Sequence, residues 1–143
     1  MRRARLEDAH AMAALGSQLG YPVPASVLAE RLAGILGRAD ELVAVACDPD
    51  GSVIGWIHGA EQRFLEASTR CELLGLVVDL GHRRQGVGHQ LVAAVERWAR
   101  NRDVREISVR SNVARTESHP FYERLGYQRA KTQHVYRKSL SAP

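Results

Sequence analysis

The chain has 143 residues, of which 45% are hydrophobic and 25% charged, which is the balance of an ordinary globular domain with its own core. No apolar run approaches the length of a membrane-spanning helix, and no apolar signal core follows the charges at the N-terminus. Cys47 and Cys71 lie inside apolar runs, which favours reduced thiols over a disulfide. We therefore expect one domain over residues 1–143, located in the cytoplasm and without a membrane partner.

The formal net charge is +4 and comes mainly from arginine. A basic balance suits an anionic ligand or a nucleic acid. No basic block interleaved with aromatic residues is present, so nucleic acid is not an expected partner. The histidines also lack the spacing of metal ligands, so no metal is expected; they are His10, His58, His82, His89, His119 and His134.

A short strand followed by two helices is predicted at the N-terminus. Arg3–Leu6 predicts a short strand, and the helical pattern after Asp8 ends near Gly20. A second helix is expected from Ser26, as its N-cap, to Gly37. Its apolar stripe consists of Leu28, Leu32, Ile35 and Leu36.

An antiparallel hairpin is predicted next. Leu42–Cys47 has the composition of a buried strand, and Asp48-Pro49-Asp50-Gly51 predicts the turn that returns the chain as the strand Val53–Ala60. Cys71–Val78 is expected to be a third antiparallel strand. A polar loop separates it from the hairpin.

A helix from Gly86 or Val87 to Arg100 follows, with Val87, Leu91, Val95 and Trp98 facing inward. The next strand, Val104–Ser111, is joined to Cys71–Val78 by this helix, so the two strands should be parallel.

The end of the chain predicts a short helix from Thr116 to Leu125, closed by Gly126. Pro120 favours a late start of this helix, near Ser118 or His119. One or two strands are expected between Tyr127 and Leu140. The predicted fold class is α/β (or α+β), with a mixed, mostly antiparallel sheet of six or seven strands and helices on both faces.

A basic, glycine-containing loop joins the apolar strand end Leu76-Val77-Val78 to the helix that follows. The start of that helix presents unpaired N–H groups and a positive dipole end, and glycines let a ligand approach the backbone closely, so the loop predicts a phosphate site. Leu91 stands where the dinucleotide fingerprint needs its third glycine, and no Lys-Ser or Lys-Thr follows the loop, which excludes both common nucleotide motifs.

Two stretches together resemble the GNAT superfamily of acyl-CoA N-acyltransferases. One is Arg83-x-x-Gly86-x-Gly88 after its strand, and the other runs from Val109-Arg110-Ser111-Asn112 to Phe121-Tyr122-Glu123-Arg124-Leu125-Gly126-Tyr127. They stand in the family's order, and the resemblance covers nearly the whole chain. It implies a GNAT-like fold and an N-acetyltransferase that moves the acetyl group of acetyl-CoA to a primary amine of a small molecule by direct attack. A protein or peptide N-acetyltransferase and a non-catalytic acyl-CoA sensor are the alternatives, and because dimers are common in the family, a homodimer is an open alternative to a monomer.

The resemblance also implies how acetyl-CoA binds. The diphosphate would lie on the amides of Arg84–His89, and Val77 and Val78 would pair with the pantetheine arm in a gap between two parallel strands. The amide of Leu76 or Val77 would polarise the thioester carbonyl, and Gly75 marks either a bulge that opens the gap or a close packing contact. The residues implied for acetyl-CoA binding are Leu76, Val77, Val78, Arg83, Arg84, Gln85, Gly86, Val87, Gly88, His89, Asn112 and Tyr122.

Catalysis is implied for two residues. Tyr122 matches the family's tyrosine that protonates the leaving thiolate, a role that suits a phenol at neutral pH. Glu72 lies where several members carry a general base, and a carboxylate between Cys71 and Leu73 would lose hydration; a water chain is the alternative. Candidates for binding the cationic acceptor are Tyr21, Trp56, His58, Glu61 and Glu66. Aminoglycosides, aminoalkylphosphonates, polyamines and peptide N-termini all remain open as acceptors.

Overall fold

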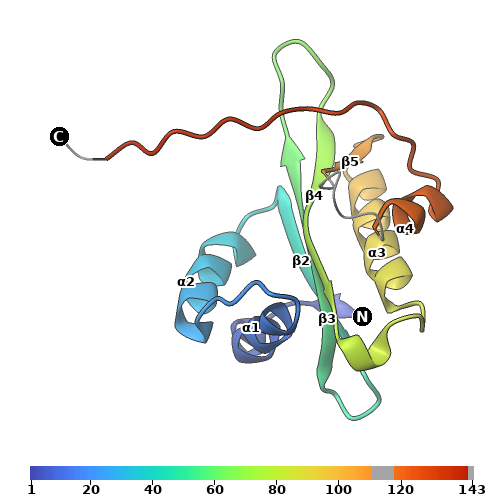
Figure 1. Cartoon of the computed structure of the whole chain (residues 1–143). Coiled ribbons are helices and arrows are strands. Elements are labelled where there is room, and N and C mark those ends of the chain that lie inside the picture. Colours follow the sequence, from blue (N-terminus) through green and yellow to red (C-terminus); the bar gives the residue numbers. More distant parts are fainter. Residues whose placement is uncertain (111–117, 142–143) are drawn as a thin grey trace. The chain divides into compact units, whose positions relative to one another are not determined.

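A computed structural model describes residues 1–110 and 118–141, and the chain divides into two compact units, Met1–Arg110 and Ser111–Pro143. The first unit holds the sheet and the three longer helices, and the second holds the short helix α4 (Ser118–Arg124) (Figure 1). In the described ranges, no helix has both the length and the apolar character needed to cross a bilayer. Both cysteines are free, as predicted.

The sheet of the first unit has five strands in the order of the sequence: β1 (Arg2–Arg3), β2 (Glu41–Cys47), β3 (Val53–Gln62), β4 (Arg70–Val78) and β5 (Ile107–Val109) (Figure 1). Neighbours from β1 to β4 are antiparallel, and β4 and β5 are parallel. The prediction of a mixed, mostly antiparallel sheet with a parallel pair across the long helix is therefore confirmed. The predicted number of six or seven strands is wrong.

The missing strands are those expected between Tyr127 and Leu140. Residues 127–141 form neither helix nor strand, and Val135, Tyr136 and Leu140 are 62%, 89% and 87% exposed. A β-strand needs a partner edge for its backbone N–H and C=O groups, and the composition of a segment does not specify that partner.

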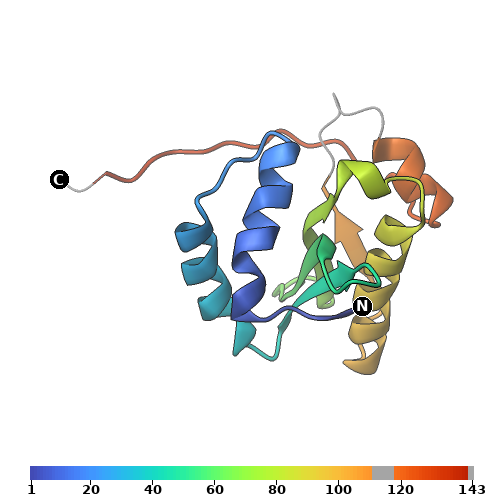
Figure 2. The ribbon, with the colours of Figure 1, turned by 90° about the horizontal axis from the view of Figure 1, so that it is seen from below.

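Helices α1 (Ala9–Gln18) and α2 (Ala25–Leu36) cover one face of the sheet (Figure 2). Met12 of α1 and Leu32 of α2 are buried in a core cluster with Val43 and Val45 of β2. Since side chains alternate between the faces of a strand, the residues on this face of β2 are those at odd positions.

The boundaries of these two helices partly match the expectation. Gly20 follows α1 with φ +82°, as expected for a helix end. The N-cap of α2 is Pro24 and not Ser26, because proline lacks an N–H and its fixed φ suits the residues that start a helix. Leu36 is 38% exposed and does not belong to the buried stripe.

Helix α3 (Val87–Asn101) covers the opposite face (Figure 2). Val87, Leu91 and Val95 are buried, as their spacing predicts. Trp98, which was also expected to face inward, is half-buried, with the guanidinium of Arg102 5.6 Å from the centre of its ring. Val92 and Ala99 take the remaining buried positions of the helix.

Asp8 is a buried carboxylate that joins β1 to the start of α1. Arg2 donates two hydrogen bonds to its oxygens at 2.8 and 2.9 Å, and the backbone N–H of Arg5 donates a third at 2.7 Å. The bonds from Arg2 hold the pKa of the Asp8 carboxyl below its usual range. This carboxylate is therefore a structural link between the first strand and the first helix.

Replacing Asp8 by Asn is expected to lower the free energy of unfolding by about 1–3 kcal/mol at pH 7, because an amide cannot accept both guanidinium bonds. The pKa of the Asp8 carboxyl is lower in the folded state than in the unfolded state. The carboxylate therefore stabilises the fold fully above the unfolded-state pKa of about 3.9, and this stabilisation is lost as the pH falls through the folded-state pKa. Urea unfolding at pH 7 and pH 3 measures this, with Glu7→Gln at an exposed neighbour as the control. An Asp8→Asn deficit of the same size at both pH values would contradict it.

Candidate active site

The basic loop lies between the end of β4 and the start of α3 (Figure 1). After Val78 the chain passes through a 3-10 turn, Leu80–His82, and reaches Gly86, the N-cap of α3, which has φ +80°. Arg84 also has a positive φ, 65°, which is uncommon for a residue with a side chain. Left-handed residues in such turns orient successive N–H groups into a concavity that binds anions.

The loop residues expected to bind the diphosphate lie together in the structure. The side chains of Arg83, Arg84, Gln85 and His89 are exposed around the N-terminus of α3. Val87 differs, because its side chain is 7% exposed and packs into the core, which leaves only its backbone N–H for a ligand. The helix start thus offers backbone donors and exposed positive charge at one place.

The start of this loop is anchored by contacts that the sequence did not predict. A carboxylate oxygen of Asp79 bonds Nδ1 of His82 at 2.7 Å, and the backbone N–H of Leu80 donates to the side-chain oxygen of Gln18 in α1 at 3.3 Å. His82 first, and then Gln18, lower the pKa of the Asp79 carboxyl. Gln18 is 62 residues from Leu80, so only the folded chain reveals the contact.

Strands β4 and β5 pair only where Cys71–Leu73 faces Ile107–Val109. Beyond Leu73, no strand of the described ranges pairs with that side of β4, so Gly75–Val78 has an open edge of backbone N–H and C=O groups. An extended ligand could pair with such an edge as a further strand would. Leu76, Val77 and Val78, which were expected to contact the cofactor, lie in this segment.

A bulge in β4 lies at the start of the open edge. His58 of β3 pairs with Gly75 and Gly59 pairs with Leu73, so Leu74 is an extra residue on β4. A Cβ at Gly75 would lie 2.9 Å from the ring of Trp56, too close to be tolerated without a shift. The two explanations left open for Gly75 therefore both apply: it adjoins a bulge, and it makes room for a close packing contact.

Glu72 lies on the same sheet face as helices α1 and α2, because it pairs with Ala60, whose side chain points to that face. Its side chain is 15% exposed, and one carboxylate oxygen lies 3.0 Å from Nε of Arg110. The ion pair with Arg110 was not expected from the sequence.

Two acceptor candidates lie on this face beside Glu72. Trp56 donates from Nε1 to the carbonyl oxygen of Met12 at 3.2 Å, and its ring lies over Gly75. His58 is two residues farther along β3 and bonds Glu41 of β2 at 2.8 Å. Trp56, His58 and Glu72 therefore surround the bulge on one side of the sheet.

The other acceptor candidates are not in this group. Tyr21 lies in the segment between α1 and α2 and is 53% exposed, and Glu66 is exposed in the loop between β3 and β4. Glu61 lies on the α3 face with a side chain that is 6% exposed, and it bonds Arg102. Its carboxylate is thus engaged on the side of the sheet opposite His58.

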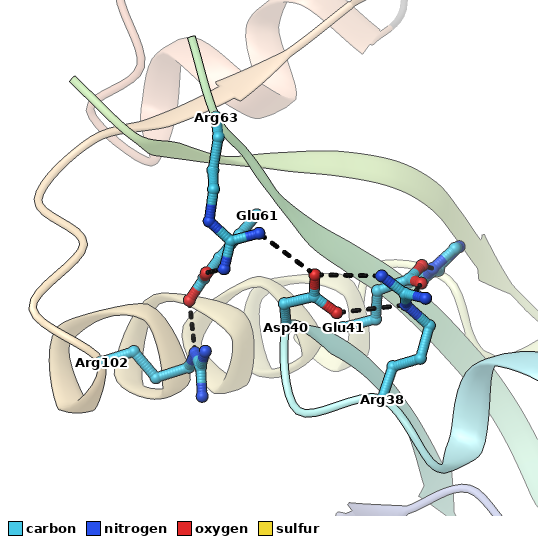
Figure 3. A network of polar contacts seen from close by, with 7 residues as sticks. Arg38, Asp40, Glu41, Glu61, Arg63 and Arg102 are labelled. Carbon is cyan, nitrogen blue, oxygen red and sulfur yellow. Dashed lines mark hydrogen bonds and ion pairs between the residues drawn. The ribbon is translucent and has the colours of Figure 1, made fainter. Parts of the chain in front are cut away.

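Glu61 belongs to a network of charged side chains at the end of the sheet remote from the basic loop (Figure 3). The guanidinium nitrogens of Arg63 lie 3.5 Å from a carboxylate oxygen of Glu61 and 3.6 Å from one of Asp40. Nε of Arg38 lies 3.2 Å from a carboxylate oxygen of Asp40 and 3.0 Å from one of Glu41. Arg38 and Arg63 are more than half exposed, so each of their pairs adds little stability on its own. The network nevertheless fixes the side chain of Glu41, the partner of His58.

In the second unit, α4 begins at Ser118, as Pro120 favours, and Gly126 follows it with φ +92°. The ring of Tyr122 is half-buried and packs edge-on against Phe121 and Tyr127, with ring centres 5.0 and 6.0 Å apart. Asn112 and the expected helix start at Thr116 lie outside the described residues.

Comparison with known proteins identifies the family. A model of the acetyltransferase (GNAT) family matches residues 9–127. The chain belongs to this family. The aminoglycoside N(6')-acetyltransferase type 1 of Stenotrophomonas maltophilia is 31% identical over 98% of this chain and 93% of its own, and the enzyme of that name from Salmonella typhimurium is 30% identical over 71% and 72%.

Solved structures agree with this GNAT assignment. The acetyltransferase AAC(6')-Iy, in complex with the bisubstrate analogue CoA-S-monomethyl-acetylneamine, superposes with a TM-score of 0.85 at 25% identity, covering 97% of both chains. A 6'-N-acetyltransferase from Acinetobacter haemolyticus has the same fold, with a TM-score of 0.84 at 20% identity and 98% coverage of both chains. The protein is an acetyl-CoA-dependent N-acetyltransferase that modifies a small-molecule amine.

Proposed function

We propose that this GNAT enzyme acetylates the 6'-amino group of an aminoglycoside. The main support is the relative from Stenotrophomonas maltophilia, which matches over nearly the full length of both chains and is named for this reaction. The carboxylates of Glu41 and Glu72, on the sheet face beside the bulge, suit a polycationic acceptor. Location in the cytoplasm and assembly as a homodimer stay predictions from the sequence.

The basic loop and the open edge of β4 would hold the co-substrate acetyl-CoA. The diphosphate is a good match for the N–H groups from Arg84 to His89, which lie at the positive end of α3. The pantetheine amides are a good match for the open edge of β4 at Val77 and Val78. In this arrangement the N–H of Leu76 or Val77 polarises the thioester carbonyl, and Asn112 binds the arm from its other side.

The reaction is a direct transfer. The neutral amine attacks the carbonyl carbon, the C–N bond forms, and the C–S bond breaks. Tyr122 gives its proton to the departing thiolate, and Glu72 takes a proton from the nitrogen, directly or through water. Burial raises the pKa of the Cys71 thiol to about 11, so this neighbour of Glu72 is protonated at neutral pH and does not serve as an acyl-carrying nucleophile.

Replacing Glu72 by Gln is expected to lower kcat about 10²-fold and to leave the KM for acetyl-CoA within twofold, because the amide keeps the shape of the side chain but cannot take a proton. The rate of CoA release from acetyl-CoA and an aminoglycoside measures both constants. The matched control is Glu106→Gln, an exposed carboxylate near the same edge of the sheet. A Glu72→Gln enzyme with the activity of the control would remove Glu72 from the mechanism.

The acceptor is tested with two aminoglycosides that differ at one position, one carrying a 6'-amine and the other a 6'-hydroxyl. Rapid CoA release with the first and only background release with the second is expected. Equal release with both would locate the transfer at another amine, and release with neither would overturn the proposed acceptor class.

A further inference from the structure

A histidine–carboxylate pair lies on the acceptor side of the sheet, apart from the residues that the family resemblance implies in catalysis. Nε2 of His58 is 2.8 Å from Oε1 of Glu41, and the two side chains are 19% and 18% exposed. Arg38 holds the other oxygen of Glu41 at 3.0 Å. The carboxylate of Glu41 is thus fixed from one side by a guanidinium and bonds the imidazole on the other.

This pairing determines the tautomer of the imidazole. An ionised carboxylate only accepts hydrogen bonds, so Nε2 of His58 must be the donor. When the ring is neutral, the lone pair is therefore on Nδ1, and within the described ranges no hydrogen bond is formed by Nδ1. A carboxylate that orients a neutral imidazole in this way prepares it to accept a proton.

The pair is also next to the place where the acyl group would lie. His58 faces Gly75 across the two strands, and the open edge of β4 is on the far side of that glycine. Gly75 has no side chain, and on this face the ring of Trp56, beside the imidazole, lies over its backbone. Adjacent strands are about 4.8 Å apart, so an amine at the open edge beside Gly75 lies about two strand spacings from the backbone of His58, a gap that the imidazole and a bridging water together would span.

Other charged groups around His58 favour a cation. On the same face are the carboxylates of Glu41 and Glu72, the latter paired with Arg110. On the covering helices, Glu30 and Arg31 are exposed, and Asp8 before α1 is engaged by Arg2. An ammonium group that approaches His58 therefore meets two carboxylates, each of which also has an arginine partner.

We propose that His58, oriented by Glu41, removes the first proton from the acceptor's ammonium group. This inference rests on the proposed transfer to an amine, which requires the nitrogen to lose two protons. Nδ1 of His58 takes one and leaves the neutral amine, and Glu72 takes the second as the C–N bond forms. The thiolate receives one proton from Tyr122, so the complete reaction releases one proton to solvent.

A route to solvent for the released proton lies beside the His58–Glu41 pair. Glu41 lines a cavity of about 130 Å³ together with Arg3, Ala4, Ile35, Leu36 and Val43. A cavity of this size with charged residues in its wall has room for several water molecules. Water in this cavity would connect the Glu41 side of the pair with bulk solvent.

The test uses His58→Ala and His58→Gln, with His10→Ala on the exposed side of α1 as the control. We expect kcat to fall about 10²-fold in both His58 variants, with the KM for acetyl-CoA unchanged, and free imidazole to restore part of the activity of His58→Ala. A structural role would not produce rescue by imidazole. Unchanged kcat in His58→Gln, or a loss in a folded His58→Ala that imidazole does not relieve, would overturn the inference.

The role of Glu41 has its own matched control. Glu41→Gln and Asp40→Asn both disturb the contacts of Arg38, but only Glu41 contacts His58. We expect kcat to fall about tenfold in Glu41→Gln and to stay within twofold in Asp40→Asn, with similar urea midpoints for the two variants. Equal losses in both would assign Glu41 to the charged network alone.

The activity of the wild-type enzyme separates the role of His58 from the proposed transfer. If the wild-type enzyme acetylates no amine, the transfer itself is wrong, and acetyl-CoA consumption is absent in all variants. If the wild type is active and His58→Gln matches it, only the assignment of the proton to His58 is wrong.

Discussion

Replacing Tyr122 by Phe is expected to lower kcat about 10²–10³-fold while binding of acetyl-CoA is retained. The ring would keep its edge-on contacts with Phe121 and Tyr127, so the substitution removes only the hydroxyl. Without that hydroxyl the thiolate must leave unprotonated or take its proton from water, and a positioned acid typically contributes a factor of this size. Steady-state kinetics gives kcat, and calorimetric titration with CoA gives the affinity.

The control for this variant is Tyr136→Phe, which removes a hydroxyl from an 89% exposed ring outside any helix or strand. Its kinetic constants should equal those of the wild type. If Tyr122→Phe retained full activity, the leaving group would not depend on Tyr122. If it lost affinity for CoA in proportion to its rate, Tyr122 would be a binding residue only.

Replacing Gly86 by Val is expected to raise the KM for acetyl-CoA at least about tenfold. Gly86 has φ +80°, where a residue with a Cβ is strained by about 1–2 kcal/mol, and a β-branched residue by more. Apart from its two chain neighbours, no residue of the described ranges lies within 4 Å of a Cβ added at Gly86, so the effect comes from the backbone and not from a clash. Relief of the strain would turn the N–H groups at the start of α3 away from the diphosphate, which weakens the site that they form.

Gly51 offers a control with the same backbone strain at a different place. It has φ +86° and lies in the turn between β2 and β3, and a Cβ added at Gly51 would likewise lie in open space. Gly51→Val should lower the urea midpoint about as much as Gly86→Val and leave the KM for acetyl-CoA unchanged. A similar rise of KM in both variants would mean that general destabilisation, and not the basic loop, controls acetyl-CoA binding.

The sequence was a good guide to those parts of the fold that local patterns determine. Apolar runs located β2, β3 and β4, and the spacing of Val87, Leu91 and Val95 located the buried side of α3. Proline and glycine set the ends of α2 and α4, although Pro24 took the N-cap position expected for Ser26. The prediction of strands after Tyr127 was wrong because a strand forms only against a partner strand, which composition does not reveal.

Contacts between distant residues explain what the sequence could not show of the site. The ion pairs of Glu72 with Arg110 and of His58 with Glu41 depend on strand register, and Leu74 shifts that register by one residue. The contact of Leu80 with Gln18 likewise joins two elements that are far apart in the chain. The left-handed Arg84 was not expected, since this conformation is typical of glycine.

Direct transfer to the amine is measured by mass spectrometry of the product formed by purified enzyme, acetyl-CoA and an aminoglycoside with a 6'-amine. We predict that the aminoglycoside gains one acetyl group, that fragmentation locates it on the ring carrying the 6'-amine, and that one CoA thiol appears for each acetyl group transferred. Acetyl-CoA bound without any acetylated product, or an acetyl group found on the protein itself, would contradict direct transfer to the amine.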